Sequence, residues 1–275
     1  MALLSHWHFD PLLILFVAAL TVLYGFISRF RRPTNNWYFG SAVFFFLLAT
    51  CSPLHFFGMH YYFSVYMVCH ITLLLLCGPL LVMALPHKPS PFVTTRLKAF
   101  AASLSSHPWL LWFAGVGIMW FWHIPIVFDD SMGAMQSGFS IISSIHPLTM
   151  LAGGFLFSWP LFSPIENRQL HPLAGVLYLF TACISCSLLG LLITFAPAGT
   201  YHHYIGMANM PGRPWNISWQ DDQQAAGLIM WVPCCFLYLT GCIYLLAHWF
   251  SAKSTNAGRR PETIKPLILH ENGKK

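Results

Sequence analysis

The stretch "HWHFDPLLILFVAALTVLYGFISRFRR", residues 6–32, decides the fold class because it joins three kinds of segment in one order. Two histidines and an aspartate come first, an apolar run follows over residues 11–28, and arginines close the stretch. A helix that crosses a bilayer needs roughly 20 mostly apolar residues. Asp10 followed by Pro11 is a typical helix start, because aspartate caps free backbone N–H groups and proline fits the first helical position. The stretch therefore predicts a membrane-spanning helix that begins at Pro11.

The composition of the whole chain agrees with a membrane protein. Of the 275 residues, 56% are hydrophobic and only 8% are charged, and the mean hydropathy is +0.60. Soluble domains carry about 25% charged residues. Most of the eight cysteines lie within apolar runs, which argues against a disulfide framework of the secreted type. We expect no cleaved signal peptide, because the arginines follow the first apolar run instead of preceding it.

Seven apolar runs, bounded by proline, glycine or charged residues, are candidate membrane spans. They cover residues 11–28, 37–51, 63–85, 109–128, 140–162, 172–195 and 223–250. We therefore predict an all-α membrane protein whose residues 1–250 form seven transmembrane helices. The polar and basic residues 251–275 are predicted to form a flexible cytoplasmic tail that contacts anionic membrane lipid.

The distribution of charge predicts the orientation of these spans, since basic residues gather on the cytoplasmic side of a membrane. With the N-terminus outside, the inner segments are residues 29–36, 86–108, 163–171 and 251–275. They hold three, three, one and six Lys or Arg residues, which is thirteen of the fourteen, and Arg213 is the exception. We predict an N-terminus outside and a C-terminus in the cytoplasm, in a bacterial inner membrane. The net charge of +6 is explained by topology and indicates no nucleic-acid partner.

The part of the chain predicted to face outward is rich in histidine and methionine. Nine of the fourteen histidines belong to it, namely His6, His8, His55, His60, His70, His123, His146, His202 and His203. Eight methionines accompany them, namely Met59, Met67, Met119, Met132, Met135, Met150, Met207 and Met210. Imidazole and thioether groups are ligands for soft or borderline transition metals.

Three of the predicted helices each carry a Met–His pair on one face. The pairs are spaced three or four residues apart, and they are Met67/His70, Met119/His123 and His146/Met150. At about 1.5 Å per residue, the three histidines lie roughly 7–10 Å below the outer ends of their spans. Ionisable residues within spans usually face the bundle interior, so we expect these pairs to converge on one metal site. The alternative for each pair is ordinary packing, since methionine fills cores and a buried histidine often hydrogen-bonds a neighbouring helix.

The remaining polar and soft side chains near the outer end each have two interpretations. The loop histidines either form a relay that collects metal or are interfacial polar groups beside aromatic residues. These loop histidines are His6, His8, His55, His60, His202 and His203. Cys69, Asp222 and Gln223 are candidates to line an outer cavity, with core packing as the alternative for the cysteine. Asp221 with Gln224 three residues later resembles a capping box at the start of the last span.

Motifs of common enzyme classes are missing from the sequence. It has no GxSxG, no HExxH and no phosphate-binding loop, and none of the predicted spans contains a lysine that could hold retinal. A chain of acidic residues across the spans, as proton pumps have, is missing as well. We therefore predict that the protein is not an enzyme.

Six stretches carry a likeness to a known family. They are "HWHFDPLLIL", "FFFLLATCSPLHFF", "YMVCHITLLL", "FWHIPIVFD", "HPLTMLAGGFLFSWPLF" and "LLGLLITFAPAGTYHHYIG…DDQQAAGLIMW". In this order they resemble the CtaG family, the assembly factors of caa-type cytochrome c oxidase. The resemblance covers most of residues 6–250. It implies a multispan protein that helps haem–copper oxidases mature and handles copper at the outer face.

The resemblance also assigns functional positions. By the family pattern these are His6, His8, Asp10, His70, His123, His146, Asp222 and Gln223. The chain departs from the pattern at Tyr66 and Cys69, where the family usually has histidine and glutamine, and at Ile145, where it has an acid. A cysteine at position 69 favours Cu(I).

Our leading hypothesis is a membrane copper chaperone that binds Cu(I) at the three Met–His pairs near the periplasmic face. It would exchange copper with a cytochrome c oxidase subunit or a periplasmic copper chaperone. Zinc as the metal and a homo-oligomeric state stay open. The alternatives are a membrane cytochrome that binds haem b through two of the helix histidines, a copper permease, and a scaffold that binds an oxidase subunit without metal.

Overall fold

The computed structural model describes residues 6–29, 32–86, 95–136, 141–165, 169–197, 199–207 and 213–257. Within these ranges the chain is helical and contains no strand. Five helices are long and apolar enough to cross a membrane, and the number is seven if two bent helix pairs each count as one span. These five helices and two pairs correspond to the seven predicted runs. The prediction of an all-helical, multispan protein is confirmed.

Prolines mark where many of the helices begin. In chain order the elements are α1 (Pro11–Ser28), α2 (Pro33–Cys51), α3 (Pro53–His60), α4 (Phe63–Ile71), the π-helix η2 (Thr72–Cys77), α5 (Gly78–Ala84), α6 (Thr95–Ser106), α7 (Pro108–Trp122), α8 (Pro125–Gln136), α9 (Ile141–Phe162), α10 (Pro172–Thr194), α11 (His202–Met207) and α12 (Trp219–Ala257). Six of them, α1, α2, α3, α7, α8 and α10, start at a proline. Proline is well placed there, because its missing N–H is one that the first turn leaves unpaired anyway.

Asp10 caps α1, as predicted, and also ties this helix to α9. Its carboxylate accepts a hydrogen bond from the Leu12 N–H (2.8 Å) and others from the hydroxyls of Ser144 (2.7 Å) and Ser143 (3.3 Å). Burial by itself would raise the pKa of Asp10, but these hydrogen bonds outweigh it and lower that pKa below its usual value. These hydrogen bonds therefore stabilise the ionised carboxylate, and helix capping accounts for Asp10 without a metal.

Two of the predicted spans are bent. The chain bends by 41° between α2 and α3 and by 70° between α7 and α8. The residue before a proline is driven away from helical geometry, which explains breaks just ahead of Pro53 and Pro125. The predicted span over residues 109–128 is consequently two helices, and His123 lies at the bend as the residue that ends α7.

The last helix differs from the prediction at both ends. It starts at Trp219, and the Ser218 hydroxyl donates to Asp221 (2.7 Å) while the Asp221 N–H donates to Ser218 Oγ (3.1 Å). Asp221 is thus the third residue of the first turn, and the predicted capping box of Asp221 with Gln224 is wrong because Ser218 caps the helix one turn earlier. The helix runs to Ala257, into the segment predicted as a flexible tail, and residues 258–275 of that tail lie outside the described residues.

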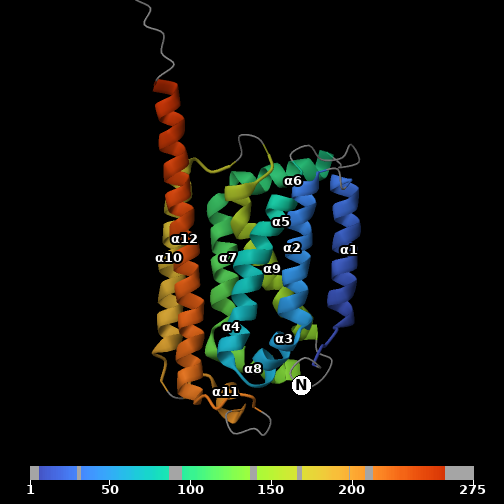
Figure 1. Cartoon of the computed structure of the whole chain (residues 1–275), viewed down its shortest axis with the longest axis vertical. Coiled ribbons are helices and arrows are strands. Elements are labelled where there is room, and N and C mark those ends of the chain that lie inside the picture. Colours follow the sequence, from blue (N-terminus) through green and yellow to red (C-terminus); the bar gives the residue numbers. More distant parts are fainter. Residues whose placement is uncertain are drawn as a thin grey trace, which may run out of the picture.

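Figure 1 shows how the helices are arranged. Helices α10 and α12 lie side by side at one flank of the bundle, and α1 lies at the opposite flank. Helices α3, α8 and α11 gather at the end where the N-terminal segment lies, and α6 lies at the other end. We call the end formed by α3, α8, α11 and the N-terminal segment the histidine end. The segments predicted to face outward share this end, so one end of the bundle collects the candidate site residues.

Candidate metal centre

His70 on α4 and His146 on α9 face each other inside the bundle. Their Nε2 atoms are 3.0 Å apart and their ring centroids 4.5 Å apart. Their side chains are almost fully shielded, with 2% and 5% of the residue surface exposed. The two imidazoles therefore form one buried pair.

His123 extends this pair on its other side. Its ring centroid lies 5.1 Å from that of His70. Its Nδ1 is 2.6 Å from the Met119 carbonyl oxygen, and its Nε2 is 3.4 Å from the Met67 sulfur. Because a carbonyl oxygen only accepts hydrogen bonds, Nδ1 carries the hydrogen and neutral Nε2 presents its lone pair to the thioether. The three imidazoles therefore lie next to one another in the order His146, His70, His123, and that the Met–His pairs form one metal site stays a prediction.

The close approach of α9 to the helices beside it brings His146 to His70. Helix α4 continues into η2, a π-helix, and such segments are rare and frequently lie at functional sites. A Cβ atom on Gly154 would lie 2.2 Å from the Leu74 carbonyl oxygen, and one on Gly78 would lie 2.3 Å from the Gly154 carbonyl carbon. Only glycine permits this backbone contact, which sets the distance between the two helices that hold the buried pair.

Two aromatic side chains, which were not predicted to belong to the cluster, also contact its histidines. The Tyr66 hydroxyl lies 3.2 Å from His146 Nε2, and the Trp122 ring packs edge-on against His146 with centroids 4.7 Å apart. The Trp122 N–H donates to the Thr149 hydroxyl (3.0 Å), which holds the indole in place. Tyr66 lies one helical turn before His70, and that spacing was a signal for its presence here. In the sequence, Tyr66 stood out only as a departure from the family pattern.

The other soft side chains that were predicted for the centre are buried in the same core. Met119, Met150 and Cys69 are 2%, 1% and 4% exposed. Met119 contributes its carbonyl group to the orientation of His123. That the sulfur atoms of Met119 and Met150 are metal ligands, and that Cys69 lines a cavity, stay predictions.

Asp222 and Gln223 connect helices at the histidine end. The Asp222 carboxylate accepts hydrogen bonds from the N–H groups of Phe63 (2.6 Å) and Ser64 (3.1 Å), the first residues of α4. The Gln223 side-chain amide donates to the carbonyls of Ile193 (3.1 Å) and Ala196 (3.0 Å), where α10 ends. Asp222 therefore satisfies free N–H groups at the start of the helix that carries Tyr66, Met67 and His70.

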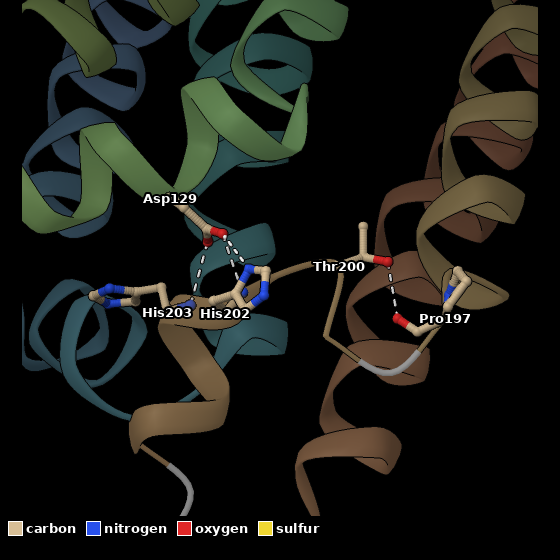
Figure 2. Close-up of polar contacts among 5 residues, drawn as sticks. All are labelled: Asp129, Pro197, Thr200, His202 and His203. Atoms are coloured by element: carbon tan, nitrogen blue, oxygen red, sulfur yellow. Dashed lines mark hydrogen bonds and ion pairs between the residues drawn. The ribbon is translucent and has the colours of Figure 1, made fainter.

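The loop histidines fall into two groups at the histidine end. The first group comprises His6, His8, His55 and His60, which lie in the N-terminal segment and on α3. The second comprises His202 and His203 on α11, next to Asp129 of α8. Figure 2 shows the Asp129 carboxylate accepting hydrogen bonds from both backbone N–H groups (3.1 and 3.2 Å) and lying 3.2 Å from His202 Nδ1. In this second group the carboxylate holds α11 against α8.

A tyrosine links α11 to the buried cluster. The Tyr201 hydroxyl donates to the His123 carbonyl oxygen at 3.2 Å. Burial raises the pKa of Tyr201 to about 12, so the hydroxyl keeps its hydrogen at physiological pH. The segment that precedes α11 is thereby fixed to the bend between α7 and α8.

The cluster combines imidazole nitrogens with a thioether sulfur. In the part of the chain that the structure describes, no three His, Cys, Asp or Glu side chains are close enough together to hold a metal ion as they stand. The close contacts are one pair of imidazole nitrogens and one imidazole nitrogen facing a thioether sulfur. Neutral imidazole and thioether are donors that suit a soft, singly charged metal ion.

Comparison with known proteins places the chain in a family. The family model described as "cytochrome c oxidase caa3 assembly factor" (Caa3_CtaG) matches residues 17–252. Neither the comparison with curated proteins nor that with solved structures gave a match. The matched range includes the whole buried cluster and every candidate span except the start of the first. The chain belongs to the caa3 cytochrome c oxidase assembly factor family.

Proposed function

We propose that this assembly factor is a copper chaperone that holds Cu(I) at the buried histidine cluster and supplies it to a haem–copper oxidase during assembly. In this proposal the histidine end faces the periplasm of a bacterial inner membrane, where the oxidase subunit or a copper carrier has access to it. The observation that carries the proposal is the convergence of three buried imidazoles and a thioether from α4, α7 and α9.

The His70–His146 contact is a hydrogen bond between two imidazoles, and a metal ion that displaces its hydrogen would fit the same distances. With a metal–nitrogen distance of about 2.0 Å and a metal–sulfur distance of about 2.3 Å, the 3.4 Å from His123 Nε2 to the Met67 sulfur corresponds to an angle at the metal of about 104°. The 3.0 Å between the Nε2 atoms of His70 and His146 corresponds to about 97°. Both angles are near tetrahedral. For one ion to contact the Nε2 atoms of all three histidines and the Met67 sulfur, the rings of His70 and His123 would have to turn toward each other.

The electrostatics favour Cu(I) over a divalent ion. Among the described residues, the two buried carboxylates are already paired, Asp222 with the start of α4 and Asp10 with the start of α1. A buried ion therefore gains no negative ligand from them, and an ion of charge +1 costs less to bury than one of charge +2. Release by ligand exchange needs no chemical step, which agrees with a role that is not enzymatic.

Metal analysis of the purified protein tests this proposal. The full-length chain in lipid nanodiscs is incubated with Cu(I) under reducing conditions, freed of unbound metal, and analysed for copper and for its visible spectrum. We expect copper well above background in the wild type and its loss when His70, His123 and His146 are all replaced by alanine. The matched control replaces His107, His171 and His248, three histidines of the opposite end, and should keep the copper.

Other results would overturn the proposal and identify an alternative. A wild type without copper, or a triple variant of the cluster that keeps it, contradicts a chaperone site at these residues. A Soret band in the purified protein indicates a haem-binding protein instead. Copper uptake into sealed vesicles indicates a permease. Normal oxidase assembly in cells that carry the copper-free variant indicates a metal-free scaffold.

A further inference from the structure

A pair of thiols that the copper proposal does not use lies in the middle of the membrane-spanning part. All eight cysteines of the chain are free thiols. Cys183 is the central residue of α10, and Cys235 lies on α12, which packs along α10 (Figure 1). Their sulfur atoms are 3.4 Å apart. The two thiols are therefore in direct contact across the interface of two helices.

Ser187 fixes the direction of the hydrogen bonds around this pair. Its hydroxyl donates to the Cys183 carbonyl oxygen at 2.8 Å, and its oxygen lies 3.1 Å from the Cys235 sulfur. Because the carbonyl takes the single hydroxyl hydrogen, the Cys235 thiol donates to the Ser187 oxygen. The Cys183 thiol in turn donates to the Cys235 sulfur. The two sulfur atoms thus face each other.

Glycine keeps the backbones of α10 and α12 close together near this pair. A Cβ atom on Gly190 would lie 2.9 Å from the Gly227 carbonyl oxygen, and one on Gly227 would lie 2.7 Å from the Gly190 carbonyl oxygen. These glycines are about two helical turns from Cys183 and Cys235. The sulfur atoms have to approach by about 1.4 Å to reach the length of a disulfide bond, about 2.05 Å. Rotation of two side chains on helices that already touch can supply this approach.

The pair is open to lipid on one side. Cys183 is 7% exposed, whereas Cys235 is partly exposed. The neighbouring side chains of Ile184 and Phe236 are 54% and 70% exposed. At the middle of a span, such exposed apolar side chains face the acyl chains of the bilayer. A lipid-soluble molecule therefore has access to the Cys235 sulfur.

Oxidation suits this position better than metal binding does. Cu(I) held by two thiolates would leave a net negative charge at the middle of the membrane, which is costly. Zn(II) needs more ligands than two sulfur atoms. A disulfide bond carries no charge, and it needs only the two sulfur atoms that are already in contact.

We propose that Cys183 and Cys235 form a redox-active pair that a membrane quinone oxidises to a disulfide between α10 and α12. Two S–H bonds break and one S–S bond forms. The two electrons and two hydrogens pass to the quinone, which becomes the quinol. A quinone is the class of oxidant that fits, because it is lipid-soluble and accepts two electrons together with two hydrogens. This inference does not depend on copper binding.

Quinol formation in the absence of dioxygen tests the proposal. Full-length protein in lipid nanodiscs is reduced, freed of reductant and mixed with decylubiquinone, and the loss of quinone absorbance is followed. Alkylation with N-ethylmaleimide and peptide mass spectrometry then identify the cysteines that have lost their thiols. We expect one quinol per chain and a disulfide that joins Cys183 to Cys235. The variants Cys183→Ala and Cys235→Ala should give no more quinol than empty nanodiscs.

The matched control is Cys242→Ala. Cys242 lies on the same helix as Cys235, but its thiol donates to the Val176 carbonyl at 3.6 Å. This variant removes a thiol from the same helix interface without touching the pair. It should therefore give the wild-type amount of quinol.

Three results would overturn the proposal. If the wild type forms no quinol and keeps all its thiols, the cysteines only pack as small apolar side chains. If the disulfide forms with the thiol oxidant diamide but not with decylubiquinone, a quinone is not the oxidant. If Cys235→Ala forms as much quinol as the wild type, other cysteines react. None of these results bears on the copper proposal, which metal analysis tests separately.

Discussion

At the residue scale, hydrogen bonds decide which atoms of the cluster are free to bind a metal. The Met119 carbonyl occupies Nδ1 of His123 and leaves Nε2 facing the Met67 sulfur, a second atom with a lone pair. No hydrogen belongs between these two atoms while the imidazole is neutral. A cation placed there would be attracted by both.

Replacement of Met67 by leucine tests this contact. Leucine has nearly the same volume and also packs well, so the fold should be kept at a cost below about 1.5 kcal/mol. The thioether is lost, and we expect Cu(I) affinity to fall by about tenfold or more, since even indirect partners of a metal site contribute that much. Competition with a Cu(I) chelator measures the affinity. The control Met132→Leu removes another fully buried methionine of the same core and should bind as the wild type does. Equal affinity of both variants would show that the Met67 sulfur is no ligand.

At the scale of elements, the cluster depends on how three helices are held at their ends and along their contact. Helix α4 begins on the Asp222 carboxylate of α12, and α9 touches η2 and α5 through glycine. The residues that make these two contacts are not candidate metal ligands. Both contacts fix the positions of the helices that carry the candidate ligands.

The substitution Asp222→Asn tests the first of these contacts. Asparagine keeps one acceptor oxygen but replaces the other by an NH2 group, which would face the N–H group of either Phe63 or Ser64, and a hydrogen bond to a charged group contributes about 1.5–3 kcal/mol. We expect the free energy of unfolding to fall by about 2 kcal/mol and Cu(I) affinity to fall with it. The control is Asp221→Asn, which changes an exposed neighbour on the same turn. Denaturation of both variants in detergent gives the comparison, and equal stability would contradict the anchoring role of Asp222.

The substitution Gly154→Ala tests the second contact. The added methyl group would lie 2.2 Å from the Leu74 carbonyl oxygen, so α9 must move away from η2. Overpacking of this kind costs about 1–3 kcal/mol, and the movement should also separate His146 from His70 and weaken copper binding. Gly117→Ala is the matched control, because a Cβ atom there meets no neighbour within 4 Å. Thermal unfolding and copper content are measured on both, and a stable, copper-binding Gly154→Ala variant would refute the close contact.

At the scale of the whole molecule, the candidate ligands lie at one end, and of the described basic residues Arg29 and Arg32 lie at the other, whereas Arg213 belongs to the histidine end. The cluster and both groups of loop histidines belong to the histidine end, while α6 and the residues after α1 lie at the other. The proposed function requires the histidine end to face outward, and the positive-inside rule predicts the same orientation.

Labelling of intact cells tests the orientation. Cysteine placed at Trp7, which is 51% exposed at the histidine end, should react with a membrane-impermeant maleimide. Cysteine placed at Arg32, an exposed residue at the start of α2, should react only after the cells are opened. A green fluorescent protein fused after residue 275 should fluoresce, as expected for a cytoplasmic C-terminus. The reverse labelling pattern would mean that the histidine end faces the cytoplasm.

The sequence by itself determined the class of protein, the positions of the apolar runs and the helices that carry the Met–His pairs. These features follow from the transfer free energy of each segment and from the periodicity of a helix, which are local properties. The start of α1 at Asp10 and Pro11 was predictable for the same reason.

Only the tertiary structure decided which atoms meet inside the bundle. The 3.0 Å approach of His70 to His146 and the presence of Tyr66 and Trp122 beside them depend on contacts between segments far apart in the chain. The bend at His123 and the glycine contact of α9 with η2 set the rotation and spacing of whole helices. Residue spacing within one helix defines a face but not the partner that this face meets, because the packing of neighbouring helices fixes that choice.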